Sequence, residues 1–305
     1  MTKRQLDKTV KAVLWTVCIA ITLCLVGINT QLTKVKEENT TLKNSVKTLG
    51  EKRDKLKKDI ETANEQNKSI MKNKADMEEQ LNNLKQTDEA IRTLVDNPED
   101  AKYAYLTFDD GPSENTEKIL DILKDYNAKA TFFVVGTGDT SLYDRIVNEG
   151  HTIALHSNTH EYSEIYADVD SFMNDLHDLS NKVVEETGVE TKFTRFPGGS
   201  INGVSAQYGG ENILADIKER LKSEGYTWFD WNVDSQDAAK SNQDKQVIVE
   251  SVLEGLNGNK QVIVLMHDAA TKDTTVEALP EIIEGLKEKG YLLKGIEEET
   301  KPIVF

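Results

Sequence analysis

The chain has 305 residues, a formal net charge of −16 at pH 7 and two cysteines. The acidic balance argues against a nucleic acid as partner, because a surface that binds phosphates is basic. Both cysteines, Cys18 and Cys24, lie in one apolar run near the N-terminus. The rest of the chain therefore has neither a disulfide framework nor thiol chemistry.

That apolar run occupies residues 12–28, carries no charge and follows a basic segment, residues 1–11. A transmembrane helix needs roughly 20 apolar residues, and about 17 is the lower limit. The basic flank predicts a cytoplasmic N-terminus, so that a single-pass anchor would hold the remaining chain outside the cell membrane. A cleaved signal peptide is the alternative. No small-x-small cleavage site follows the run, which favours the anchor.

Residues 31–95 have the heptad pattern of a coiled coil. One heptad position is apolar throughout, from Val35 to Ile91, whereas its companion position, from Leu32 to Val95, is about half polar. This pattern predicts a coiled-coil stalk, and chains anchored in one membrane would pair as a parallel homodimer. A lone charged helix is the alternative, since Gly50 costs about 1 kcal/mol inside a helix.

Residues 96–102 are expected to be a linker around Pro98, and the pattern of apolar and polar residues changes in residues 103–305. Short apolar runs there alternate with amphipathic helical patterns, which predicts a parallel α/β sheet or a small barrel. The expected strands are 103–108, 130–136, 152–156, 192–196, 226–233, 261–266 and 291–296. The expected helices begin near Glu114, Ser141, Asp168, Glu211, Lys245 and Val276.

Polar residues follow five of the expected strands. They are Asp109 and Asp110; His156 and His160; Arg195; Asp234 and Asp237; and His267 with Asp268. Because the carboxyl ends of parallel strands meet at one edge, this recurrence predicts one functional site there.

His156 and His160 are the candidate metal ligands. Their i,i+4 spacing places both rings on one side if the segment turns helically. With a strand-end carboxylate they form the two-histidine, one-carboxylate set that catalytic zinc uses. The same set suits non-haem iron, although nothing in the sequence indicates an oxygenase, and it also accepts cobalt or nickel. His151 and His177 are expected to be structural.

The adjacent carboxylates Asp109 and Asp110 repel each other unless a cation offsets their charge. A divalent cation bound to one of them would acidify a water, whose proton the other carboxylate could take. His267, from another strand, is the candidate donor of a proton to a leaving group.

Three further residues complete this expected chemistry. Arg195 is expected to hold a carboxylate bidentately, and Asp237 to orient a cation, either Arg195 or protonated His267. The backbone N–H groups around Gly198 are expected to face a developing oxyanion. Together these groups predict metal-assisted hydrolysis of an acyl group.

The motifs "TFDDGP", "HSNTH", "RFPGG" and "LMHD" resemble, in order and spacing, those of the polysaccharide deacetylases, the NodB-homology domain of carbohydrate esterase family four. The resemblance covers residues 101–296 and implies a distorted, incomplete (β/α)7 barrel. It implies these roles: Asp109 as general base; Asp110, His156 and His160 as metal ligands; Arg195 as the residue that orients the base; Gly198 as oxyanion donor; His267 as acid; and Leu265 as a wall of the acetyl pocket.

The fourth motif, "VDSQDA", departs from the family pattern. Asp237 aligns with the family's aspartate, but Ala238 stands where the family has a tryptophan that borders the acetyl group. Another aromatic residue, such as Tyr208, would have to supply that wall. Tyr208, Tyr162 and Tyr166 are also candidates for stacking on sugar rings, and ordinary solvated loops are the alternative.

The resemblance and the predicted anchor together lead to an expected function. The chain is expected to be a zinc-dependent, or cobalt- or nickel-dependent, hydrolase that removes N-acetyl groups from the N-acetylglucosamine of cell-wall peptidoglycan. The alternatives are an O-acetyl esterase, a deacetylase of chitooligosaccharides or another polysaccharide, and a coiled-coil envelope scaffold with a non-catalytic domain.

Overall fold

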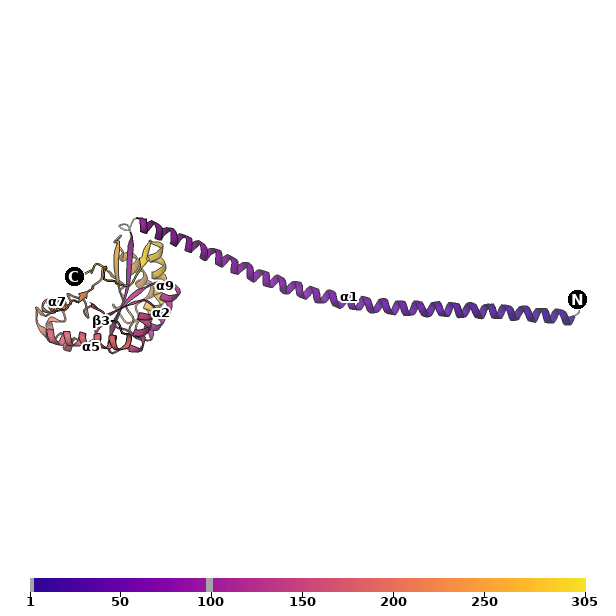
Figure 1. Cartoon of the computed structure of the whole chain (residues 1–305), viewed down its shortest axis with the longest axis horizontal. Coiled ribbons are helices and arrows are strands. Elements are labelled where there is room, and N and C mark those ends of the chain that lie inside the picture. Colours follow the sequence, from indigo (N-terminus) through magenta and orange to yellow (C-terminus); the bar gives the residue numbers. More distant parts are fainter. Residues whose placement is uncertain (1–2, 97–100) are drawn as a thin grey trace. The chain divides into compact units, whose positions relative to one another are not determined.

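The computed structural model describes residues 3–96 and 101–305, which fall into two compact units, residues 1–88 and 89–305 (Figure 1). The expected linker, residues 96–102, lies largely outside the described residues. On its two sides the helix α1 (Lys3–Asp96) ends and the strand β1 (Lys102–Asp109) begins.

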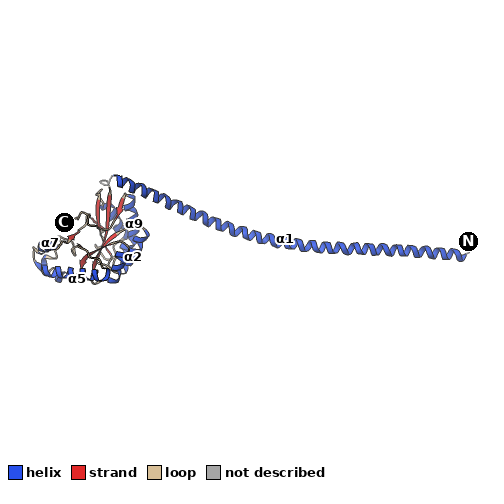
Figure 2. Ribbon diagram, viewed as in Figure 1, coloured by secondary structure: helices blue, strands red, loops and turns tan. Residues whose placement is uncertain are grey.

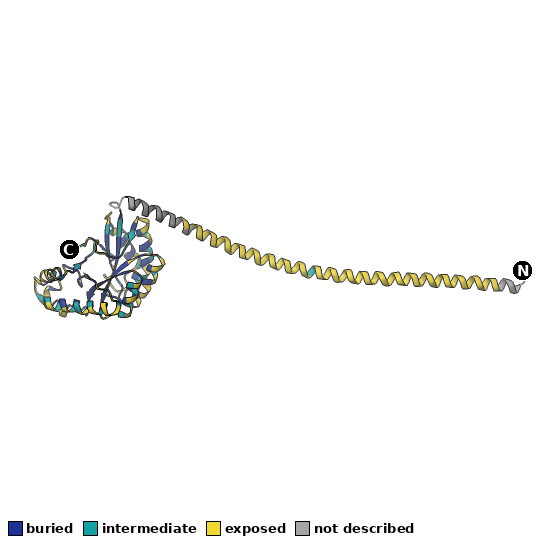
Figure 3. Cartoon of the chain, in the orientation of Figure 1, coloured by how far each residue is buried: buried dark blue, intermediate teal, exposed yellow. Residues whose placement is uncertain are grey.

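α1 contains a stretch that is long and apolar enough to cross a membrane. Its apolar heptad positions are uncovered within the single chain: Leu42 is 63 % exposed and Leu56 is 60 % exposed (Figure 3). Gly50 lies inside the helix without interrupting it. The heptad residues from Leu84 onward lie outside the residues whose side chains are described.

The second unit alternates strands and helices, as the sequence predicts (Figure 2). After β1 the strands are β2 (Ala130–Val135), β3 (Thr152–Ser157), β4 (Phe193–Thr194), β5 (Thr227–Trp228), β6 (Val233–Asp234), β7 (Gln261–His267) and β8 (Tyr291–Leu293). The helices are α2 (Glu114–Asp125), the 3-10 turn η2 (Thr140–Leu142), α3 (Tyr143–Asn148), α4 (Tyr162–Ile165), α5 (Val169–Thr187), α6 (Ala206–Gly209), α7 (Ile213–Ser223), α8 (Lys245–Gly255) and α9 (Asp273–Glu288).

The strands form one curled parallel sheet in the order β5-β4-β3-β2-β1-β7-β6, with β8 beside the first residues of β1. β5 and β6 form the two ends of this order, yet only residues 229–232 separate them in the chain. This arrangement confirms the incomplete (β/α)7 barrel.

The single strand expected at residues 226–233 is divided in the structure. The Phe229 N–H donates to the Thr194 carbonyl at one edge of the sheet, whereas the Asn232 N–H donates to the Ile263 carbonyl at the other. The segment therefore crosses the gap between the two edges, and one continuous strand cannot pair with both.

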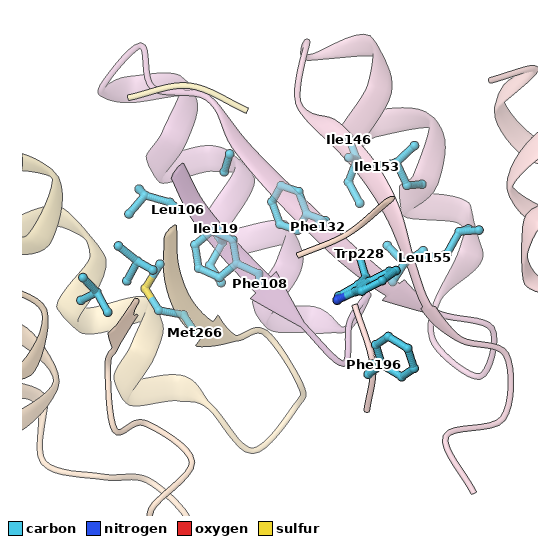
Figure 4. Packing of buried hydrophobic residues seen from close by; sticks show 14 of the residues in the cluster. Leu106, Phe108, Ile119, Phe132, Ile146, Ile153, Leu155, Phe196, Trp228 and Met266 are labelled. Carbon is cyan, nitrogen blue, oxygen red and sulfur yellow. The ribbon is translucent and has the colours of Figure 1, made fainter. Parts of the chain in front are cut away.

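Strand alternation separates two apolar layers in this unit. Leu106 and Phe108 of β1, Phe132 of β2 and Met266 of β7 belong to the large cluster that the helices cover (Figure 4). The Phe108 and Phe132 rings stack with their centroids 5.2 Å apart. The opposite side of the strands encloses a smaller cluster: Tyr105, Phe133, Ala154, Phe229, Ile263 and Ile296.

The same alternation brings the functional side chains inside the barrel. Because side chains two residues apart lie on one face of a strand, Asp109 follows Tyr105 and Thr107 inward, and His267 follows Ile263 and Leu265. His156 likewise follows Ala154, and Arg195 follows Phe193. Within β1–β7 pairing, Asp109 lies directly opposite His267.

Candidate active site

Asp109 and Arg195 form a buried ion pair at the carboxyl edge of the sheet. Asp109 is 3 % exposed and Arg195 is fully buried. Nη1 of Arg195 donates to Oδ1 of Asp109 at 2.8 Å. A buried carboxylate without a cationic partner costs several kcal/mol, so Arg195 offsets the cost of burying Asp109 and fixes its orientation.

The remaining donors of Arg195 contact other groups. Nη1 also donates to the Thr107 hydroxyl, while Nε and Nη2 donate to the carbonyl oxygens of Phe229 and Asp230. The guanidinium lies 4.1 Å from the centroid of the Phe133 ring. The expected bidentate contact is therefore wrong: Arg195 gives one donor to the carboxylate and uses the others to tie β4 to the segment that crosses the barrel gap.

Asp110, His156 and His160 converge on a second point at this edge. Oδ1 of Asp110 lies 3.4 Å from Nε2 of His156 and 3.2 Å from Nε2 of His160. One ligand atom from each of the three residues lies within 4.8 Å of the others. Burial favours the neutral acid, but the contacts with both histidines outweigh it, so the pKa of the Asp110 carboxyl lies well below its ordinary value.

The tautomer of His156 indicates what this cluster accepts. Nδ1 of His156 lies 2.9 Å from the Arg195 carbonyl oxygen, which can only accept, so Nδ1 carries a proton. In a neutral ring Nε2 then presents a lone pair to Asp110, whose buried Oδ1 has no hydrogen bond to any residue that the structure describes. Two facing lone-pair groups need a proton or a cation between them. A divalent cation fits, because histidine ligands are commonly held through the other ring nitrogen in this way.

Two of the three residues adopt left-handed backbone conformations, with φ of 73° at Asp110 and 59° at His160. Such a conformation costs a non-glycine residue about 1–3 kcal/mol and persists where the surroundings impose it. At Asp110 it interrupts the strand alternation, so that adjacent aspartates reach different partners: Asp109 contacts Arg195, and Asp110 contacts the histidines.

The loop that carries the histidines is held by Asp175 of α5, a residue that the sequence did not single out. Its two carboxylate oxygens accept from the Ser157 hydroxyl, the Asn158 N–H, and the N–H and hydroxyl of Thr159, at 2.7–2.9 Å. The Ser157 hydroxyl in turn accepts from the His160 N–H. The i,i+4 pair therefore converges through a strand end and an anchored bend, and the condition of a helical turn is not met.

His267 has a carboxylate partner of its own, Asp237. Nδ1 of His267 lies 2.8 Å from Oδ1 of Asp237, and Oδ2 accepts from the His267 N–H and from the Thr275 hydroxyl. Asp237 was expected to orient either Arg195 or His267, and in the structure it contacts His267. Burial lowers the pKa of His267, but Asp237 outweighs this and raises it to about 9. The ring therefore holds a proton at neutral pH.

Gly198 and Leu265 lie on elements that border these groups. Gly198 is exposed, with φ of 79°, in the turn after β4. Among the described residues its N–H makes no hydrogen bond. Leu265 of β7 is 7 % exposed and pairs with Thr107 and Asp234 on the neighbouring strands.

The aromatic residues that were expected to contact substrate differ in how far they are exposed. Tyr166 is fully buried and its hydroxyl donates to the Pro197 carbonyl, so the expectation that it stacks on a sugar ring is wrong. Tyr208 is 46 % exposed and Ala238 is exposed. Trp231 lies against the glycine turn: a Cβ on Gly199 would be 3.1 Å from its ring.

Asp268 is a buried carboxyl that sequence reasoning left without a role. Its Oδ2 accepts from the Thr116 hydroxyl at 2.5 Å, while Oδ1 is buried and has no hydrogen bond within the described part of the chain. Burial, with the nearby charges of Asp110 and Asp109, raises the pKa of Asp268 to about 7. This acid is therefore partly neutral at physiological pH.

Comparisons with known proteins agree with the fold. The profile of the polysaccharide deacetylase family matches residues 96–212. A peptidoglycan-N-acetylglucosamine deacetylase of Bacillus cereus is 32 % identical over 205 residues, which cover 65 % of this chain and 71 % of that protein. A chitooligosaccharide deacetylase of Sinorhizobium fredii is 29 % identical over 212 residues, 63 % of this chain and 89 % of that protein.

Among solved structures, the catalytic domain of a peptidoglycan N-acetylglucosamine deacetylase from Eubacterium rectale superposes with a TM-score of 0.65 at 34 % identity. The match covers 67 % of this chain and 92 % of that one. The fold of a partial barrel is thus shared with that solved structure. The chain belongs to the polysaccharide deacetylase family, whose members are deacetylating hydrolases.

Proposed function

We propose that this protein is a metal-dependent N-deacetylase acting on the N-acetylglucosamine residues of peptidoglycan. The observation that carries the proposal is the convergence of Asp110 with two histidine Nε2 atoms at 3.4 and 3.2 Å. That cluster shares one barrel edge with Asp109, which is paired with Arg195, and with the protonated His267. The names of the Bacillus cereus and Eubacterium rectale relatives support the substrate.

Asp110, His156 and His160 would hold the cation, for which we propose Zn²⁺, with Co²⁺ and Ni²⁺ accepted by the same ligands. When bound, such a cation supplies Lewis acidity, which polarises a carbonyl group and lowers the pKa of water. Asp175 serves this set indirectly, because it holds the backbone between the two histidines.

Asp109 and His267 divide the proton transfers between them. Asp109, held by Arg195, takes a proton from the water that attacks the acetamide carbon. His267, held by Asp237, gives a proton to the nitrogen as the C–N bond breaks. Acetate and a free amino sugar result. The division is supported by the partners of the two residues, because Asp109 contacts the cation Arg195 and His267 contacts the anion Asp237.

Gly198 and Leu265 would receive the acetyl group. The Gly198 N–H, which makes no hydrogen bond among the described residues, would be a donor for the oxygen on which negative charge develops. Leu265 is the apolar side chain next to His267 on the inward face of β7, and it would contact the methyl group.

Mass spectrometry of muropeptides tests the proposal. The purified full chain, in detergent and with added Zn²⁺, is incubated with peptidoglycan, with chitin oligomers and with O-acetylated xylan. We expect each hydrolysed peptidoglycan sugar to lose the mass of one acetyl group. Acetate release from xylan alone would replace the proposal with an O-acetyl esterase, and release from chitin oligomers alone with a chitooligosaccharide deacetylase.

We further propose that residues 12–28 of α1 anchor the protein in the cell membrane with the catalytic unit outside. The apolar stretch of α1 and the basic residues before it support this orientation. Protease added to intact cells should then digest the catalytic unit, whereas protection of that unit would contradict the orientation.

We also propose that α1 pairs with a second copy as a parallel coiled coil. The support is the row of exposed leucines at one heptad position, with Leu42, Leu49 and Leu56 each at least 60 % exposed. Leu56→Asp should weaken dimers measured by ultracentrifugation in detergent, whereas Lys58→Asp, on the outer heptad position, should not. Equal dimerisation of both variants would contradict this pairing.

A further inference from the structure

Tyr162, at the start of α4, places its hydroxyl directly over the glycine turn. A Cβ built on Gly198 would lie 2.8 Å from the Tyr162 hydroxyl oxygen. Gly198 has φ of 79°, a conformation that glycine adopts readily and other residues do not. Because residue 198 is a glycine, the Tyr162 hydroxyl can occupy the space next to the Gly198 backbone.

The ring of Tyr162 is fixed by its neighbours. It contacts His160 edge to face at a centroid distance of 5.6 Å, and the Tyr166 ring at 5.6 Å. It also packs against the large apolar cluster. The Tyr166 hydroxyl donates to the Pro197 carbonyl, which ties α4 to the residue before Gly198. With its ring packed in this way, Tyr162 is poorly placed to stack on a sugar, but its hydroxyl is held in position.

Both donors at this point lack an acceptor. Neither the Tyr162 hydroxyl nor the Gly198 N–H makes a hydrogen bond within the part of the chain that the structure describes. A phenol hydroxyl can donate one hydrogen bond. The two groups therefore form a pair of preorganised donors beside His160, one of the metal ligands proposed above.

We propose that Tyr162 is a further catalytic residue, whose hydroxyl donates a hydrogen bond to the acetyl oxygen as negative charge develops on it. It acts beside the Gly198 N–H, so that one side-chain donor and one backbone donor face the same oxygen. This inference rests on the proposed deacetylase function.

The test is the kinetics of Tyr162→Phe in the full chain, with Zn²⁺ and soluble peptidoglycan fragments. The variant removes one oxygen atom and keeps the packed ring. We expect kcat to fall about 100-fold, the typical loss for one oxyanion donor, with KM and zinc affinity unchanged. Tyr126→Phe is the matched control, since that hydroxyl contacts Glu284 between α2 and α9, and it should keep full turnover.

A second variant guards against a structural explanation. Gly198→Ala places a methyl group against the hydroxyl and strains the backbone, so it should also lower kcat. In the Tyr162→Phe background the nearest remaining Tyr162 atom is a ring carbon, 3.5 Å from that methyl group. The same substitution should therefore cost less there, and the two effects should be less than multiplicative.

Three outcomes would overturn the inference: unchanged kcat in Tyr162→Phe, a rise in KM alone, or a loss of zinc affinity equal to the loss of turnover. Absence of turnover in the unmodified chain would overturn the proposed function as well. Equal turnover in the unmodified chain and in Tyr162→Phe would overturn only the role of Tyr162.

Discussion

Replacement of Asp237 by asparagine should change the pH dependence of the enzyme more than its maximum activity. Asp237 contacts both the ring and the backbone N–H of His267 and stabilises the protonated ring. The rise in the pKa of His267 from 6.5 to about 9 corresponds to about 3 kcal/mol, at 1.36 kcal/mol per unit. A neutral asparagine removes this stabilisation, while burial continues to oppose the charge.

The sign of the change follows from the role of His267 as an acid. In the unmodified protein the ring holds its proton up to about pH 9. In Asp237→Asn the pKa should fall to about 6.5 or below, so that about 3 % of the rings are protonated at pH 8. Activity at pH 8 should therefore fall about 30-fold, whereas activity at pH 6 should change little.

The assay is the pH profile of kcat/KM between pH 5 and 10, with both proteins loaded with the same metal. Asp234→Asn is the control, because Asp234 ends β6 three residues before Asp237 and its carboxylate accepts from the Gln236 N–H instead. An alkaline limb at the same pH in Asp237→Asn and in the unmodified protein would refute the reasoning. So would an equal loss of activity at every pH.

Three further predictions concern the supports of the site. Asp175→Asn should weaken zinc binding about 10–100-fold, measured by competition with a chelator, because outer partners orient metal ligands; unchanged affinity would contradict this. Arg195→Met should lower the free energy of unfolding by about 3–5 kcal/mol in urea, because it leaves Asp109 buried and unpaired; a loss below about 1 kcal/mol would argue against it. The raised pKa of Asp268 means that the folded chain binds this proton more tightly, so the metal-free chain should lose stability from about pH 4 to 7. Asp268→Asn should flatten that decline, and an unchanged slope would contradict the assignment.

The succession of strands along the chain and the residues at their ends could be predicted, because both depend on the local sequence pattern. Alternating apolar runs identify the strands, and parity along β1 and β7 brings Asp109 and His267 to the same side. The division of residues 226–233 could not be predicted, since its cause is the distance between the two edges of the sheet. That distance depends on the curvature of the whole sheet.

The supports of the site were the least predictable part. Asp175 lies in the middle of α5, where an aspartate reads as a solvent-facing residue, and only the folded chain brings it to the bend after β3. The left-handed backbone of Asp110 is likewise imposed by tertiary contacts. An aspartate beside the apolar face of a helix has no feature in the sequence that would indicate a contact with a distant loop.

The most direct test of the central claim compares Asp110→Asn and Asp109→Asn for metal content and acetate release on the same preparations. Asp110 contacts both histidines and Asp109 contacts Arg195, so the two variants should fail in different ways. We predict that Asp110→Asn loses the bound metal together with turnover, whereas Asp109→Asn keeps the metal and loses turnover. Full metal binding and full acetate release in Asp109→Asn would contradict the account.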